Sequence, residues 1–328
     1  MIIQLAPDAD TDLVKRALVA AGLWVTALHD GSRRVSHFSV SAASSAVEAT
    51  DLLRIPGVAS VVSPASVHPR VDASPSTVDV RGVEVGGASR VFMAGPCAVE
   101  SEAQIDAVAA RVAAAGAQLL RGGAFKPRSS PYAFQGHGEV ALRWMRRAAE
   151  ANGLRVVTEA LGEADVSLVA EYADLVQVGS RNMQNFSLLK AIGRTGRPVM
   201  LKRAMSATVD EWLLAGEYLL EHGAAGVIYC ERGIRGFDRS TRNLLDLGAV
   251  ALLAHVHHLP VVVDPSHATG RRDLVLPLAR AGLAAGAAGV MLETHDDPGR
   301  ALSDGPQALL PAEFSAVMAS LRSGSAEA

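Results

Sequence analysis

Short apolar runs alternate with longer segments of helical period from Val91 onward, and this alternation constrains the fold more than any other feature of the chain. The eight runs are VFMA (91–94), QLL (118–120), LRVVT (154–158), DLVQV (174–178), PVML (198–201), GVIYC (226–230), PVVV (260–263) and GVML (289–292). Eight βα units predict an α/β fold closed as a (β/α)8 TIM barrel. An open doubly wound sheet is the alternative, but the first run is followed by no glycine fingerprint of the dinucleotide-binding kind.

The helical segments and the chain length agree with this prediction. Two of the expected helices open with capping boxes, SEAQ at 101–104 and TVDE at 208–211. A barrel of about 250 residues leaves room in 328 residues for one small additional module.

Residues 1–66 have another order of elements. Strands are expected at 2–5, 23–28, 34–40 and 58–63, and helices at 11–22 and 44–55. This βαββαβ order predicts a ferredoxin-like domain. Residues 67–77, rich in proline, serine and charge, are predicted to be a linker, and 78–328 the barrel, opened by a β-hairpin at 78–87 that closes its bottom.

Composition excludes several classes of function. With 31 Lys and Arg against 34 Asp and Glu, the net charge of −3 indicates no basic face for nucleic acid. No apolar run approaches the roughly 18 residues of a membrane span, and the N-terminus turns acidic before a signal-peptide core could form. Two cysteines cannot make a disulfide framework. We therefore expect a cytoplasmic protein with no nucleic-acid or membrane partner.

Polar side chains follow every predicted barrel strand, at the end where active sites of such barrels lie. Six of them are cations: Arg121, Lys126, Arg128, Arg181, Lys202 and Arg232. Any one of these could form a salt bridge at the barrel rim, but six at a single mouth are costly unless an anion binds there. Arginine forks suit phosphate and carboxylate groups, so a small phosphorylated acid or sugar is the predicted class of substrate.

Cys97 lies at the first strand-to-helix turn, where a thiol is most exposed to reaction. One cysteine alone is more often a small buried hydrophobe, and a Cys/His nucleophile would leave nearby carboxylates without a purpose. Four metal-ligating side chains come from the first, seventh and eighth strand ends, which are neighbours in a closed barrel: Cys97, His267, Glu293 and Asp304. This mixed set predicts one divalent Mn, Fe, Co or Zn ion. Cys230 is expected to pack in the barrel, and His295 could be a fifth ligand or a partner of one.

Long motifs resemble type I 3-deoxy-D-arabino-heptulosonate-7-phosphate (DAHP) synthases, of the beta subgroup that carries a ferredoxin-like N-terminal domain. They are AGPCAVES (94–101), RGGAFKPRSSPYAFQG (121–136), RNMQN (181–185), LKRAMSAT (201–208), CERGIR (230–235), DPSHATGRRDLV (264–275) and LSDGPQ (302–307). The resemblance implies a transferase that condenses phosphoenolpyruvate with erythrose 4-phosphate and water at the entry to the shikimate pathway of aromatic amino acid biosynthesis.

Roles for individual residues are also implied by this resemblance. Arg121, Lys126 and Lys202 would hold the carboxylate end of phosphoenolpyruvate. Its phosphate would meet Arg181 and Arg232. The phosphate of erythrose 4-phosphate would meet Arg128 and Ser129. The metal on Cys97, His267, Glu293 and Asp304 would polarise the aldehyde, Lys126 would donate a proton, and Glu159 would order a water molecule.

Two other functions have to be weighed. The related 3-deoxy-manno-octulosonate-8-phosphate synthases share the phosphoenolpyruvate half of the reaction, but their acceptor loop has an Ala-Asn pair where this chain reads KPRSS (126–130). A non-catalytic anion-binding barrel would need the cations but not Cys97 and its three partners. Ser180 and Ala204 depart from the family motifs, which would have Ala and Gly there, and Ala204 raises the question of its backbone angles.

The N-terminal module has two readings, a packing domain without a ligand or a regulatory domain. In similar proteins such a domain binds tyrosine or phenylalanine, which makes allosteric feedback control an expectation of the resemblance. A homotetramer is implied in the same way.

Overall fold

The computed structural model describes residues 1–128 and 130–323, and the chain divides into two compact units, Met1–Val67 and His68–Ala328. The boundary lies one residue after the predicted end of the first module.

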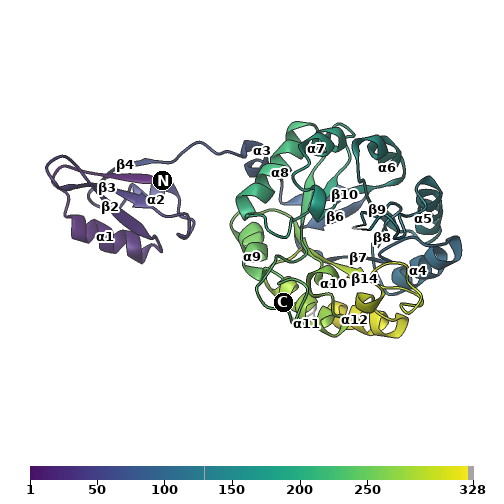
Figure 1. Ribbon diagram of the computed structural model, residues 1–328. Coiled ribbons are helices and arrows are strands. Elements are labelled where there is room, and N and C mark those ends of the chain that lie inside the picture. The colour runs from purple at the N-terminus through teal and green to yellow at the C-terminus, as the bar shows by residue number, and fades with distance from the viewer. Residues whose placement is uncertain (129, 324–328) are drawn as a thin grey trace. The chain divides into compact units, whose positions relative to one another are not determined.

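The second unit is a closed barrel of eight parallel strands in the order β10-β11-β12-β13-β14-β7-β8-β9 (Figure 1). The strands are β7 (Val91–Gly95), β8 (Leu119–Arg121), β9 (Arg155–Glu159), β10 (Leu175–Val178), β11 (Val199–Lys202), β12 (Val227–Glu231), β13 (Val261–Val263) and β14 (Gly289–Glu293). The predicted TIM barrel is confirmed, and each strand begins and ends within one residue of its apolar run.

Helices follow the strands and form the outer layer (Figure 1). They are α4 (Glu102–Ala114), α5 (Glu139–Ala151), α6 (Val166–Tyr172), α7 (Phe186–Gly193), α8 (Val209–Glu221), α9 (Leu247–His255), α10 (Pro265–Thr269), α11 (Val275–Ala284) and α12 (Pro311–Ser323). Their apolar faces and the outward strand residues share one core, which covers the sheet. Among the described residues, no helix combines the length and apolar character that crossing a membrane would require.

The two predicted capping boxes differ. At the start of α8, Thr208 and Glu211 cap each other's backbone N–H in a complete box. At α4, Ser101 accepts the Gln104 N–H at 3.1 Å, but the Gln104 side chain accepts from Glu100 N–H and donates to Ala98 O. The box at α4 is therefore only half formed. The Gln104 side chain bonds to Ala98 and Glu100, in the turn after Cys97, and not to the N–H of Ser101.

A β-hairpin of β5 (Thr77–Val80) and β6 (Val83–Gly86) packs against the inward-facing residues of the barrel. Val78, Val80 and Val85 are buried with Met93 and Met291. Arg81 and Gly82 both have positive φ, 52° and 89°, as a two-residue hairpin turn requires. Cys230 belongs to this interior cluster, as expected of a packed residue, and burial raises its pKa to about 12.

Part of the predicted linker is instead a helical turn of the barrel unit. Residues Pro69–Asp72 form α3, with Pro69 in the first turn. Val71 is 1% exposed in the outer core, and the N–H groups of Arg70 and Val71 donate to Glu217 of α8 at 3.0 and 2.9 Å. Proline, serine and charge predicted a linker here, but the Glu217 side chain that these N–H groups bind is distant in the sequence and leaves no local pattern.

The first unit is a four-stranded antiparallel sheet in the order β2-β3-β1-β4. Its elements are β1 (Ile2–Leu5), α1 (Thr11–Ala20), β2 (Val25–His29), β3 (Val35–Val40), α2 (Ala49–Leu52) and β4 (Val58–Val62). It has its own apolar core, in which Ile3, Leu18 and Phe38 are fully or almost fully buried.

The predicted second helix of this unit, 44–55, is wrong in length. Only α2, a single turn, forms. Ser44 Oγ accepts the Trp24 N–H at 2.9 Å, and Ser45 N–H donates to Gly22 O. These serines bond to the chain near β2 and so leave the helical conformation.

Candidate active site

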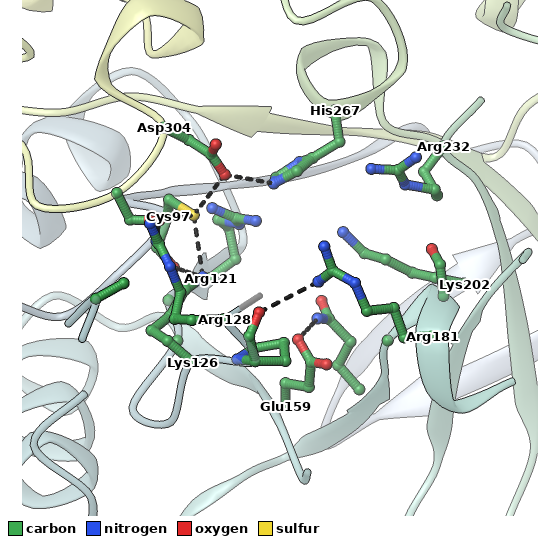
Figure 2. A pocket seen from close by; sticks show the side chains of 18 of the residues that line it. Cys97, Arg121, Lys126, Arg128, Glu159, Arg181, Lys202, Arg232, His267 and Asp304 are labelled. Atoms are coloured by element: carbon green, nitrogen blue, oxygen red, sulfur yellow. Dashed lines mark hydrogen bonds and ion pairs between the residues drawn. The ribbon is translucent and has the colours of Figure 1, made fainter. Parts of the chain in front are cut away.

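A cavity of about 510 Å³ opens at the carboxyl ends of the barrel strands (Figure 2). Ten of the predicted site residues line it: Cys97, Arg121, Lys126, Arg128, Glu159, Arg181, Lys202, Arg232, His267 and Asp304. Glu293, at the end of β14, is completely buried beside them. Ser129 lies outside the described residues. These ten side chains therefore share one cavity, and the roles assigned to them stay predictions.

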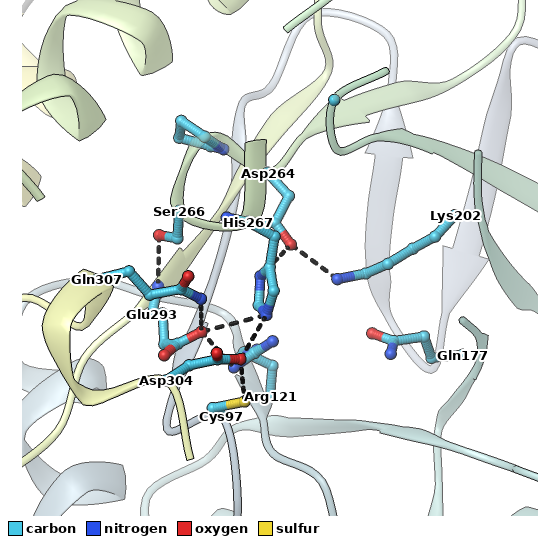
Figure 3. A network of polar contacts seen from close by, with 12 residues as sticks. Cys97, Arg121, Gln177, Lys202, Asp264, Ser266, His267, Glu293, Asp304 and Gln307 are labelled. Atoms are coloured by element: carbon cyan, nitrogen blue, oxygen red, sulfur yellow. Dashed lines mark hydrogen bonds and ion pairs between the residues drawn. The ribbon is translucent and has the colours of Figure 1, made fainter. Parts of the chain in front are cut away.

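The four candidate metal ligands form one cluster, with one ligand atom from each all within 4.8 Å of one another (Figure 3). Cys97 Sγ is 3.3 Å from Asp304 Oδ2, and His267 Nε2 is 3.3 Å from Glu293 Oε2. A metal with bonds of about 2.0–2.3 Å fits between atoms at such separations. Asp304 reaches the cluster from a left-handed backbone conformation, with φ of 54°.

The electrostatics of the cluster suit a cation. Burial raises the pKa of the Cys97 thiol, and the nearby Glu293 carboxylate adds to this. Burial also raises the pKa of Glu293 to about 7, and Glu293 Oε1 is buried without a hydrogen-bond partner. Burial lowers the pKa of His267 to about 3, so its imidazole is neutral, the form that binds metals. Thiolate, imidazole and carboxylate donors with one oxygen unpaired fit a divalent transition metal ion.

Two of the cations contact this cluster directly, and a third contacts Asp264 beside it. Lys126 Nζ donates to Cys97 Sγ at 3.0 Å and to Cys97 O at 2.8 Å. Arg121, 6% exposed, donates to Pro96 O at 2.8 Å and lies 3.7 Å from Glu293 Oε2. Lys202, 5% exposed, pairs with Asp264 Oδ2 at 2.7 Å. Positive charge therefore borders the metal cluster on the cavity side.

The other three cations surround the open part of the cavity (Figure 2). Arg128 donates to Ser303 Oγ at 2.6 Å, and Arg181 donates to Pro127 O at 3.2 Å. Burial lowers the pKa of Arg232, which marks a charge held away from water. None of these three has a carboxylate partner among the ion pairs of the described residues, so an anionic ligand would complete their contacts.

Glu159, at the end of β9, faces the same cavity. Its Oε2 accepts from Gln177 Nε2 at 3.0 Å. A side chain at Gly179 would come within 2.0 Å of Glu159 Oε1, so the glycine leaves the space that this carboxylate occupies. The site thus holds one carboxylate apart from the metal cluster.

Some residues of the site were missed or left without a role by the sequence reasoning. Asp264 opens the DPSHATGRRDLV motif (264–275) but was given no function, yet it contacts both Lys202 and His267 (Figure 3). Arg242 and Ser303 line the cavity from long loops, where no apolar run marks their position.

The open questions about individual residues have structural answers. His295 lies outside the metal cluster: its Nδ1 accepts the Asp297 N–H at 3.0 Å and its Nε2 faces Glu100 at 3.4 Å. Ala204 is not among the residues with positive φ, so replacing the expected glycine creates no strain. Ser180 opens a short 3₁₀ turn, η2 (Ser180–Asn182), which carries Arg181 at the cavity.

Comparison with known proteins agrees with the resemblance of the sequence motifs. The family model of the DAHP synthetase I family matches residues 66–325. A phospho-2-dehydro-3-deoxyheptonate aldolase of Thermotoga maritima is 50% identical over 234 residues, 71% of this chain and 69% of that protein. A 2-dehydro-3-deoxyphosphooctonate aldolase of Alkalilimnicola ehrlichii is 31% identical over 252 residues, 70% of this chain and 89% of that protein.

Solved structures agree. A crystal structure of the Thermotoga maritima phospho-2-dehydro-3-deoxyheptonate aldolase (DAHP synthase) matches with a TM-score of 0.78 and 38% identity, covering 99% of this chain and 97% of that one. A truncated form of the Thermotoga maritima enzyme matches with a TM-score of 0.72 and 43% identity, over 77% and 93% of the two chains. The match of the family model over most of the chain, together with 50% identity to the Thermotoga maritima relative, shows that this chain belongs to the DAHP synthetase I family.

Proposed function

We propose that this protein is a metal-dependent DAHP synthase, a transferase that condenses phosphoenolpyruvate with D-erythrose 4-phosphate and water to give DAHP and phosphate. One observation carries the proposal: six cations line a cavity together with Cys97, His267 and Asp304, three members of a Cys-His-Glu-Asp cluster. Two phosphorylated substrates, one with a carboxylate as well, account for the cations, and carbonyl chemistry accounts for the metal ligands.

The cations divide between the two substrates. Arg121, Lys126 and Lys202, the three nearest the cluster, bind the carboxylate end of phosphoenolpyruvate, and Arg181 and Arg232 bind its phosphate. Arg128 and Ser129 bind the phosphate of erythrose 4-phosphate. This assignment follows the motif resemblance, and the described cations have the placement in the cavity that it needs.

The metal site consists of Cys97, His267, Glu293 and Asp304. A divalent ion bound there supplies a Lewis acid for the aldehyde of erythrose 4-phosphate. The protein holds Sγ of Cys97 and Nε2 of His267 toward the same point and excludes water from Glu293, which is fully buried.

The protein's own residues position the reacting groups and move protons. C3 of phosphoenolpyruvate forms the new bond to the aldehyde carbon, and the aldehyde oxygen, which gains the electron pair, takes a proton from Lys126. The oxygen of a water molecule adds at C2, near Glu159, and becomes the C2 carbonyl oxygen as the C2–O bond to phosphate breaks. Of the two protons of that water, one restores Lys126 and the other leaves with the phosphate. The fixed cations stabilise the negative charge on substrate and leaving group without rearrangement.

A phosphate-release assay tests this function. Phosphoenolpyruvate is supplied with either erythrose 4-phosphate or arabinose 5-phosphate, with and without a chelator. We expect turnover with the four-carbon sugar alone, lost on chelation and restored by a divalent metal. Turnover with arabinose 5-phosphate would instead indicate an octulosonate-8-phosphate synthase, and phosphoenolpyruvate binding without turnover would indicate a non-catalytic anion-binding barrel.

The N-terminal unit is proposed to be a ferredoxin-like regulatory domain, which would place the protein in the beta subgroup of the family. Its sheet order β2-β3-β1-β4, with helices after β1 and β3, supports this fold. We further propose that tyrosine or phenylalanine binds there as a feedback inhibitor, that the protein is a homotetramer, and that it acts in the cytoplasm.

A further inference from the structure

Asp264 lies between Lys202, which lines the cavity, and His267, a member of the metal cluster. It follows β13 and is completely buried. Its Oδ1 accepts the backbone N–H of His267 at 3.0 Å and so caps α10. Its Oδ2 is shared: Lys202 Nζ lies 2.7 Å away and His267 Nδ1 2.9 Å away (Figure 3).

This sharing ties a metal ligand to a cation of the cavity. The Nδ1 contact is close in distance but is not aligned as a hydrogen bond. A carboxylate at this distance favours the tautomer with its proton on Nδ1, which leaves the Nε2 lone pair of His267 on the side of Glu293 Oε2, 3.3 Å away. The same oxygen holds the ammonium of Lys202, which lines the cavity. One carboxylate oxygen therefore accepts a hydrogen bond from Lys202 and lies within ion-pair distance of His267, a predicted metal ligand.

We propose that Asp264 is a positioning residue that couples metal binding to phosphoenolpyruvate binding, through the oxygen that Lys202 and His267 share. The inference rests on the proposed function. A metal held by His267 would make the imidazole more positive and draw its Nδ1 side toward Oδ2, so that Oδ2 would hold Lys202 less tightly and the ammonium could reach the substrate carboxylate. In the reverse direction, a substrate that attracts Lys202 leaves Oδ2 to His267, which makes the imidazole a better ligand. Coupling of this kind is reciprocal.

The chain offers a matched control. Asp246 also caps a helix of the barrel, since its Oδ1 accepts the Ala249 N–H at 3.0 Å, and its Oδ2 also pairs with a buried cation, Arg203, at 2.8 Å. Within the described part of the chain, Asp246 belongs neither to the metal cluster nor to the residues that line the cavity. Replacing either aspartate by asparagine leaves an oxygen for the cap and removes the charge from the pair.

The experiment measures binding without turnover, on the full-length protein stripped of metal with a chelator. Calorimetry gives the dissociation constants of Mn²⁺ alone, of phosphoenolpyruvate alone, and of phosphoenolpyruvate at saturating Mn²⁺. The last two give a coupling factor. For the wild-type protein we expect phosphoenolpyruvate to bind at least about fivefold more tightly with Mn²⁺. Direct attraction between ion and substrate contributes to this factor in every variant, so the comparison with Asp264→Asn isolates the contribution of Asp264.

For Asp264→Asn we expect Mn²⁺ to bind about 10–100-fold more weakly and the coupling factor to fall severalfold, because the new amide N–H₂ faces two donors. Asp246→Asn should leave both quantities within about twofold of wild type. Unchanged Mn²⁺ affinity in Asp264→Asn, or an unchanged coupling factor, would overturn the proposal.

A second variant removes the cation that shares Oδ2 of Asp264, and it also serves as the test if Asp264→Asn does not fold. Lys202→Gln removes the ammonium but touches no metal ligand. With Oδ2 left to His267, Mn²⁺ should bind severalfold more tightly and the coupling factor should fall. Mn²⁺ affinity equal to wild type would count against a path through Asp264.

If the wild-type protein turns over with erythrose 4-phosphate yet shows no coupling, only this inference fails. If it binds no phosphoenolpyruvate, the proposed function fails with it.

Discussion

At the scale of single residues, burial gives the metal cluster its chemistry. Cys97 and Glu293 are almost or completely buried, and each is less acidic than it would be in water. A cation bound by these two groups would offset the free energy needed to keep them charged in a buried site. The cluster therefore holds more protons without a cation than with one. The neutral imidazole of His267 completes a set that favours a cation over a proton.

Replacing Cys97 by serine tests this view. The hydroxyl is a poor ligand for a soft divalent ion, so Mn²⁺ or Zn²⁺ should bind at least about tenfold more weakly and turnover should fall in parallel. Calorimetry of the metal-free protein and the phosphate-release assay measure the two effects. Cys230→Ser, at the other cysteine, should leave metal affinity unchanged. Full turnover by Cys97→Ser under metal-limiting conditions would contradict a role of the thiolate in binding.

Lys126 is expected to act on turnover more than on binding. Lys126→Gln removes the ammonium that contacts Cys97 Sγ, and loss of a proton donor should lower kcat about 10²–10⁴-fold. Phosphoenolpyruvate affinity should change much less, because Arg121 and Lys202 remain. The half-buried pair of Lys190 with Tyr218, away from the cavity lining, offers a control, Lys190→Gln, which should keep normal kcat. A Lys126→Gln enzyme with weak substrate binding but unaltered kcat would assign the residue to binding alone.

At the scale of elements, buried polar side chains attach the peripheral segments to the barrel. Asp174, which precedes β10, has a side chain 1% exposed and lies 3.0 Å both from Arg81 in the hairpin turn and from Arg146 of α5. It also accepts the Val156 N–H at 2.8 Å. One carboxylate thus joins the β5–β6 hairpin, β9 and a helix of the outer layer.

The charge of Asp174 should contribute to stability in a pH-dependent way. Burial alone would raise its pKa, but the Val156 N–H and the two arginines outweigh burial and hold the pKa below its usual value. Its contribution is therefore complete above the unfolded-state pKa of about 3.9 and is lost as the pH falls through the lower folded-state value. Asp174→Asn should cost about 3 kcal/mol in urea unfolding at pH 7 and flatten the acid limb of the stability profile. The exposed pair Arg54–Asp51 gives the control Asp51→Asn, expected to cost less than about 1 kcal/mol.

At the scale of the whole molecule, the two compact units meet at Val67 and His68, and α3 belongs to the barrel unit. Each unit has a core of its own, which is the usual condition for separate folding. The position of α3 matters for any truncation, because a chain that begins after the predicted linker loses Val71 from the outer core.

A chain that begins at His68 should keep the turnover of the full-length protein and lose inhibition by tyrosine or phenylalanine. A chain that begins at Ser74 should lose about 2 kcal/mol of stability as well, since it lacks the buried Val71 side chain. Urea unfolding and the phosphate-release assay with added amino acids measure these effects. A full-length protein that neither amino acid inhibits would remove the regulatory role, and equal stability of the two truncated chains would remove the role of α3.

The sequence by itself determined the barrel and the side chains at its mouth. The period of the apolar runs is a local property, and a polar residue just after a run must lie at the active end of a parallel strand, so Cys97, Arg121 and Glu293 could be placed without coordinates. Only the tertiary structure decided that 69–72 form a helix, that 44–48 do not, that His295 faces Glu100 and that Asp264 joins Lys202 to His267. Each of these depends on partners brought close by the closed barrel or by the small sheet, and contacts between residues distant in the chain leave no periodic signal in the sequence.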